Sequence, residues 1–259
     1  MAEDRTEKGV KSLNVALDVM EAVAAAEEDV GVTELAARLG LTKPTVFRHL
    51  QTLVERNYIV QNNKTARYRL GIQCQLLAET SGSRVDLRSA SEEVVTWLRD
   101  ETGLSVVLSA VRARSIVVLA TLLARSPLQL GVRPGSELPL HSSAQGYVAL
   151  AFGPRSLASF AKKQSWEATT RYTSTGWEAV EVKIARAQGQ GWIDAPEEMA
   201  LGLNGAAAPI FDDRGECVGA IAVVGLIQNL PHEVDPRVTR ALLAAAERVS
   251  ANLGHTVER

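Results

Sequence analysis

Basic and amide side chains are concentrated between residues 38 and 69 of a chain whose net charge is only −2. Glu55 is the only acid in that stretch, and its cations are Arg38, Lys43, Arg48, Arg56, Lys64, Arg67 and Arg69. Arginine, glutamine and threonine can hydrogen bond to the edges of bases, and clustered cations bind phosphates. A solvated basic surface would carry the same charge. The spacing of the apolar and turn residues around these cations must therefore distinguish a DNA-binding surface from a merely solvated one.

Two helices are predicted before this stretch. Leu13, Leu17 and Met20 recur at helical spacing and give an amphipathic first helix. The second is expected over Thr33–Leu39, with Thr33 as its N-cap and with Gly40 ending it, because glycine adopts positive φ at little cost.

A third helix is expected from Lys43, capped by Thr42, with Pro44 in its first turn. The spacing of Ala36, Gly40 and Val46 is typical of a helix-turn-helix, in which the second helix enters the major groove. Its outward residues, together with Thr33, Pro44 and two residues of the following hairpin, form the predicted DNA-contacting set: Thr33, Lys43, Pro44, Thr45, Phe47, Arg48, Gln51, Thr52, Lys64 and Arg67.

A strand-like hairpin follows this helix. The segments 58–60 and 67–70 are joined by a polar turn, so Lys64 and Arg67 would lie at or near the tip of a wing and meet phosphate or the minor groove. A winged helix that serves only protein contacts is the alternative, and the excess of cations favours DNA.

The rest of the chain alternates between helical and strand-like segments. A short helix is expected over 71–80, a domain boundary near residue 82, and an α+β sheet domain beyond it. The expected helices are 85–101, 143–152, 176–190 and 235–253, and the expected strands are 104–111, 116–122, 206–211 and 217–225.

Three segments carry a resemblance to a known family. They are KSLNVALDVMEAV with the helix-turn-helix and wing after it, LPLHSSAQGYVALAFG, and GQGWIDAPEEMALGLNGAAAPIFDDRGECVGAIAVVG. Together they resemble the IclR family of bacterial transcriptional regulators. The resemblance implies a winged helix-turn-helix domain over 1–70, a linker helix over 71–82 and a GAF- or profilin-like α/β effector-binding domain over 83–259. It also implies homodimers, or dimers of dimers, on a palindromic operator in double-stranded DNA.

The resemblance further implies a pocket for a small organic effector. Its expected lining residues are Leu140, Ser142, Ser143, Ala144, Gln145, Asp194, Asn204, Gly205, Ala222 and Val224. Where the family commonly has a cysteine and two serines, this chain has Gly205, Ala222 and Val224, so Asp194 alone remains of that polar set. Fewer polar anchors predict a bulkier effector with an apolar or aromatic body, with Gln145 as a new polar contact. The alternative is a repacked core that has lost its ligand.

Other classes of protein are disfavoured. His141 adjoins Ser142 and Ser143, but the chain has no G-x-S-x-G elbow, so an enzyme is not expected. The histidines lack metal-ligand spacing, and no cofactor fingerprint occurs. The absence of an apolar run of about 18 residues argues against a membrane partner, and Cys74 and Cys217 fit a reducing cytoplasm. Repression is expected, although an activator would share every one of these features.

Overall fold

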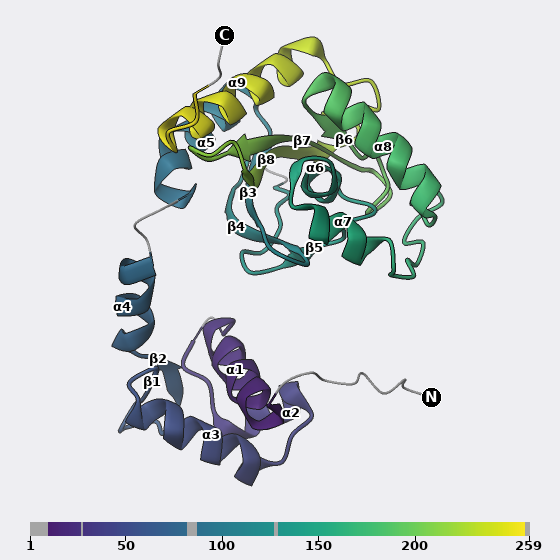
Figure 1. Cartoon of the computed structure of the whole chain (residues 1–259). Helices are drawn as coiled ribbons and strands as arrows, with labels where there is room; N and C mark the ends of the chain where they lie inside the picture. Colours follow the sequence, from purple (N-terminus) through teal and green to yellow (C-terminus); the bar gives the residue numbers. More distant parts are fainter. Residues whose placement is uncertain (1–9, 27, 82–86, 127–128, 257–259) are drawn as a thin grey trace. The chain divides into compact units, whose positions relative to one another are not determined.

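The computed structural model describes residues 10–26, 28–81, 87–126 and 129–256 (Figure 1). The chain divides into two compact units, Met1–Arg84 and Val85–Arg259, and each is described by itself. Within the described ranges, no helix is long and apolar enough to cross a membrane.

The N-terminal unit is a winged helix-turn-helix, as predicted. Its elements are α1 (Lys11–Ala24), α2 (Val32–Leu39), α3 (Lys43–Glu55), β1 (Ile59–Gln61), β2 (Tyr68–Leu70) and α4 (Ile72–Ser81). Gly40 ends α2 with φ of +64°, a conformation that glycine adopts without strain. Val19, Leu35, Val46, Leu50 and Ile59 are fully buried and form the centre of its core.

Two details differ from the sequence prediction. α1 packs through Val19 and Val23, whereas Leu13 and Leu17, expected on its apolar face, are exposed. α2 begins one residue early, with Gly31 as its N-cap, so Thr33 lies inside the first turn and caps nothing. The hydrophobic residues of α1 therefore form two sets, one in the core and one on the surface.

The C-terminal unit is built on a six-stranded antiparallel sheet. Its order is β5 (Glu137–Leu138), β4 (Ile116–Leu122), β3 (Ser105–Val111), β8 (Cys217–Leu226), β7 (Leu203–Phe211) and β6 (Ile193–Asp194). The long strand β8 lies between β3 and β7 and pairs with β7, with Gly205 opposite Val224 and Ala207 opposite Ala222. The predicted α/β domain is therefore present.

Helices cover both faces of this sheet (Figure 1). α5 (Leu87–Thr102) and α9 (Pro236–Asn252) pack on one face, where Leu98 and Leu242 meet Val223. α6 (Ala144–Phe152), α7 (Arg155–Ala161) and α8 (Trp177–Gln190) lie on the other. Alternate residues of β8 serve opposite faces, as the period of two along a strand requires.

The short elements β5, β6 and α7 were not predicted. Strands of two residues and a helix of seven carry too little periodicity to be read from sequence. Residue 85, where the first helix of this unit was expected to begin, and the boundary near residue 82 lie outside the described residues.

Candidate functional site

The exposed side of α3 carries most of the predicted DNA-contacting residues. Lys43, Arg48, Gln51 and Thr52 are exposed, and Phe47 is 43% exposed although it is aromatic. Val46 and Leu50 on the opposite side hold the helix to the core, which fixes the direction in which the polar side chains project. This surface combines cations, hydrogen-bonding groups and an apolar contact for bases.

The cations of this unit fall into two groups. Lys43, Arg48 and Lys64 make no ion pair within the described residues. Arg38 and Arg67 instead share the carboxylate of Glu34, at 2.5 and 3.1 Å. Arg67 was predicted near the wing tip as a phosphate contact, but its guanidinium is held against α2.

The wing is the hairpin of β1 and β2, and Asn62 holds it to the segment before α2, whereas Lys64 in its turn is exposed. Asn62 donates from Nδ2 to Asp29 Oδ2 at 3.1 Å and accepts from the backbone N–H of Lys64 at 3.0 Å. Val30 pairs with Tyr68 as an additional bridge beside β2. Lys64 therefore sits exposed on a braced turn.

A pocket of about 480 Å³, including the part that opens to solvent, lies in the C-terminal unit. It is enclosed by the start of α6, the paired strands β7 and β8, and the segment between β6 and β7. All predicted effector residues except Leu140 and Asp194 line it: Ser142, Ser143, Ala144, Gln145, Asn204, Gly205, Ala222 and Val224. The remaining lining residues are Val132, Leu138, Ala195, Met199 and Leu203, none of which the sequence singled out.

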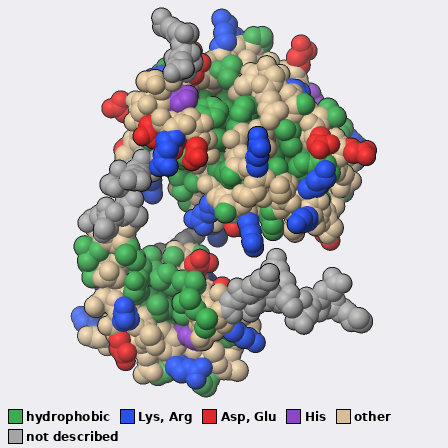
Figure 2. Space-filling model, viewed as in Figure 1, with side chains coloured by type: hydrophobic (Ala, Val, Ile, Leu, Met, Phe, Trp, Pro, Cys, Tyr) green, Lys and Arg blue, Asp and Glu red, His purple; other side chains and the backbone are tan. Residues whose placement is uncertain are grey.

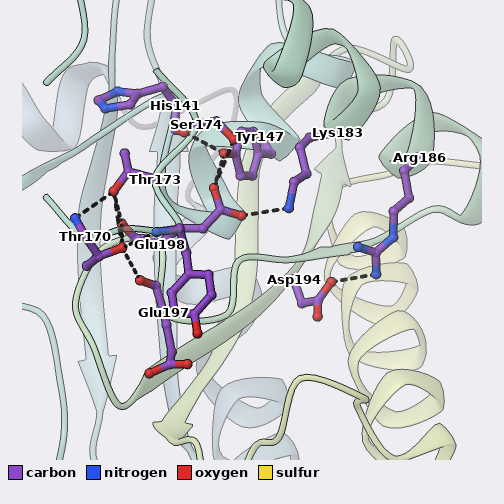
Figure 3. A network of polar contacts seen from close by, with 11 residues as sticks. His141, Tyr147, Thr170, Thr173, Ser174, Lys183, Arg186, Asp194, Glu197 and Glu198 are labelled. Atoms are coloured by element: carbon purple, nitrogen blue, oxygen red, sulfur yellow. Dashed lines mark hydrogen bonds and ion pairs between the residues drawn. The ribbon is translucent and has the colours of Figure 1, made fainter. Parts of the chain in front are cut away.

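Asp194 does not line the pocket and pairs with Arg186 instead. Its carboxylate is buried and accepts a hydrogen bond from Arg186 Nη2 at 2.6 Å, on the side facing α8 (Figure 3). Leu140 packs with the core between α6 and the sheet instead of lining the pocket. The lining thus lacks a charged side chain, and most of its residues are apolar.

The first turn of α6 lies tight against the loop before it. Ser143 caps the helix by accepting from the N–H of Gly146 at 3.0 Å and donates to Pro139 O at 2.6 Å. A Cβ atom on Gly146 would meet Pro139 O at 2.4 Å and Leu140 Cα at 2.7 Å, so no larger residue fits. This packing fixes the loop that presents Ser142.

Two polar side-chain atoms in the described residues are buried without a hydrogen-bond partner, namely Ser142 Oγ and Asn204 Oδ1. Both residues line the pocket, Ser142 from the loop before α6 and Asn204 from β7. Buried polar atoms without partners are uncommon in folded proteins and cost stability. Their occurrence together at one pocket indicates a place where a ligand supplies the missing partners.

Glu198 holds the two walls of the pocket together (Figure 3). Its buried carboxylate accepts from Tyr147 of α6 at 2.5 Å and from Lys183 Nζ of α8 at 2.8 Å. The Tyr147 hydroxyl also lies 2.5 Å from the backbone oxygen of His141. Burial, followed by the hydrogen bond to Glu198, raises the pKa of Tyr147, so its hydroxyl stays protonated.

Glu197 also holds the segment between β6 and β7 in place. It adopts a φ of +57°, and its carboxylate accepts from the N–H of Gly202 and from His232, both at 2.9 Å. The N–H of Gly202 and then His232 lower the pKa of Glu197. Threonine hydroxyls from residues 169–173 also donate to the backbone oxygens of residues 197 and 198.

The His141 and Ser143 side chains do not meet as a nucleophile and a base would. His141 stacks on Trp166, with ring centroids 5.0 Å apart, and its Nε2 lies 3.3 Å from Glu167 O. Burial lowers the pKa of His141. Among the described residues, no cluster of histidine, cysteine or acidic side chains could hold a metal ion.

Comparison with known families identifies both units. Residues 12–63 match the IclR helix-turn-helix domain, and residues 80–251 match the family described as "Bacterial transcriptional regulator IclR C-terminal". The two matches together span most of the chain.

Individual relatives match along nearly their whole length. The chain is 28% identical to the glycerol operon regulatory protein of Streptomyces coelicolor, covering 95% of this chain and 98% of that one. It is 26% identical to the HTH-type transcriptional regulator KdgR of Escherichia coli, covering 97% and 96%. It shares its fold with an IclR homolog of Microbacterium hydrocarbonoxydans solved with 4-hydroxybenzoate, at a TM-score of 0.78 and 20% identity, covering 93% and 98%.

Proposed function

The chain belongs to the IclR family of DNA-binding bacterial transcriptional regulators, and we propose that it is a repressor whose hold on a palindromic operator is set by a small organic effector. Its family is one of regulators, many of them repressors, and not of enzymes. The observation that carries the effector proposal is the pocket at the start of α6, with its apolar wall and its two unpartnered polar atoms. Operator footprinting with a reporter assay separates repression from activation.

We infer that α3 lies in the major groove and that the wing lies on the backbone. Arg48 and Gln51 are exposed and free to reach base edges, and Lys43 and Lys64 are free to bind phosphates. The domain limits that we propose are 1–70 for DNA binding, 71–82 for the linker helix and 83–259 for the effector domain.

A homodimer is supported by apolar side chains that the N-terminal unit leaves on its surface. Figure 2 shows hydrophobic side chains gathered over α1 and α4. They include Leu13, Leu17, Ile72, Leu76 and Leu77, each more than two-fifths exposed. Apolar surface of this kind is covered in partner interfaces, and a symmetric pair of winged helices matches a palindromic operator.

The pocket itself supports an effector with an apolar or aromatic body. Gly205, Ala222 and Val224 contribute no polar side chain to its lining. An apolar wall with a few polar groups is typical of sites for small molecules. The Microbacterium relative, which shares the fold, was solved with a small aromatic acid.

Filling the pocket tests this proposal. A Cβ atom on Gly205 would meet its nearest neighbours at 3.8 Å, so Gly205→Leu is expected to fold and to occupy the space of the ligand. The matched control is Gly189→Leu on α8, where an added Cβ atom has no neighbour within 4 Å. Thermal-shift titrations would use aromatic and aliphatic acids, alcohols and amides.

We expect at least one of these probes to stabilise the wild type and the control but not Gly205→Leu. A stabilising probe should also change operator binding in the wild type and the control but not in Gly205→Leu, whose pocket is already filled. Failure of every probe to stabilise the wild type would contradict a ligand pocket.

A further inference from the structure

The orientation of two side-chain amides in the pocket is fixed by their bonds outside it. Asn204 donates from Nδ2 to the backbone oxygen of Pro231 at 3.0 Å. A carbonyl oxygen can only accept, so the amide nitrogen must face Pro231, and Oδ1 must face away from it. Asn204 is buried, and Oδ1 has no partner among the described residues.

Gln145, in the first turn of α6, is held in the same way. Its Nε2 lies 3.1 Å from Val107 O and 2.8 Å from Ser109 Oγ, both on β3. None of these sheet residues lines the pocket, whereas Gln145 does. With its N–H groups committed to the sheet, this amide has only its oxygen to offer a ligand.

From these two amides we infer that the effector carries a hydrogen-bond donor, a hydroxyl or an amide N–H, on the end that enters between Asn204 and Gln145. This inference rests on the proposed effector pocket and narrows the class of its ligand. Two fixed amide oxygens attract a donor and repel a carboxylate, and the lining holds no cation to offset that repulsion. Arg186, which could have provided one, is paired with Asp194.

Ser142 adds the second contact. Its hydroxyl can both donate and accept, so it can bind the oxygen of the same ligand hydroxyl or the carbonyl of an amide. A neutral alcohol, phenol or amide on an apolar body would therefore give both buried atoms, Ser142 Oγ and Asn204 Oδ1, a hydrogen-bond partner. A ligand lacking a donor would leave Asn204 Oδ1 buried and unpaired.

Matched probe pairs test this inference on the full chain by isothermal titration calorimetry. Benzyl alcohol is compared with benzyl methyl ether, benzamide with N,N-dimethylbenzamide, and benzoate serves as the anionic probe. We expect each donor to bind about tenfold or more tightly than its methylated partner, because an acceptor left buried and unpaired costs affinity. Benzoate should bind more weakly than benzamide.

Asn204→Leu should reduce that preference to near unity, since it removes the acceptor at similar volume. The matched control is Asn252→Leu on α9, which removes a similar amide bond, from Nδ2 to Ala90 O at 2.8 Å, away from the pocket. Circular dichroism checks that both variants fold, and the wild-type probe pairs decide the question even where a variant does not.

Equal binding of donor and methylated probes, tightest binding of benzoate, or an unchanged preference in Asn204→Leu would each overturn the inference. If benzoate or the ethers bind and Gly205→Leu blocks them, the effector pocket stands and only the donor requirement falls. If no probe binds the wild type, both proposals fall.

Discussion

The hydroxyl of Tyr147 joins the two walls of the pocket, because it contacts both Glu198 and the backbone oxygen of His141. Tyr147→Phe should lower the free energy of unfolding by about 1–3 kcal/mol, since it leaves a buried carboxylate with one donor fewer. Urea unfolding measures this change. Tyr172→Phe is the control: that side chain is exposed and its hydroxyl accepts from the exposed Arg171, so its loss should change stability little. Equal effects in the two variants would show that the wall contact contributes nothing.

Glu197 should make the pocket wall sensitive to acid. Its pKa in the folded chain lies below the ordinary value of 4.5, so its stabilising effect is complete above that value and is lost as the pH falls through the lower, folded value. The melting temperature of the wild type should therefore exceed that of Glu197→Gln near neutral pH, and the difference should shrink below pH 4.5. A difference that stays constant with pH would exclude this role.

Most residues of the pocket lining could be predicted from the sequence, but their hydrogen-bonding roles could not. Gln145 and Asn204 could be placed at the pocket, yet which end of each amide faces a ligand depends on Val107, Ser109 and Pro231, which are remote in sequence. Asp194 could not be separated from the lining, because its partner Arg186 becomes visible only once α8 packs beside β6.

Among the elements of the N-terminal unit, α3 is the one that should read bases. Arg48→Ala should cost about 1–3 kcal/mol on the operator and much less on random DNA if Arg48 contacts a base edge. Fluorescence anisotropy with both DNAs measures the two losses. Equal losses would mean that Arg48 binds only phosphate.

The contact between α2 and the wing should limit how many cations reach DNA. Glu34→Gln removes the ion pairs of Arg38 and Arg67 and leaves Arg67 only its hydrogen bond to the backbone oxygen of Asp29, so it should tighten binding to random DNA and steepen its salt dependence. The control, Glu55→Gln, removes the same charge from α3 without freeing an arginine, since Glu55 makes no ion pair within the described ranges. Identical salt slopes for the two variants would show that the bridges do not compete with phosphate.

Elements with strong periodicity were predicted closely, whereas short ones were not. The start of α3 follows from its cap and proline, the bounds of β4 follow from a β-branched run, and all of them agree with the structure. The first helix showed the limit of pattern reasoning. Leu13 and Leu17 have core-like spacing, yet they are exposed, because periodicity identifies an apolar face without saying whether the chain itself covers it.

For the whole molecule, that exposed surface predicts self-association. Leu76→Glu should weaken the dimer and lower affinity for a palindromic operator more than for a half-site, because a charge opposes burial of the α4 surface. Sedimentation velocity and operator titration measure the two effects. Val182→Glu on α8, at an exposed position of the other unit, is the control. An unchanged dimer in Leu76→Glu would place the interface elsewhere.

The close approach at Gly146 constrains how this protein can diverge. Any other residue at 146 would collide with the backbone of the loop that presents Ser142, and no change in a neighbouring side chain could relieve a clash with backbone atoms. Amino-acid replacement at this position is therefore excluded, whereas Gly205 on β7 has room for a larger side chain. In descendants of this gene, new ligand preferences should arise from substitutions on β7 and β8, while the start of α6 stays unchanged.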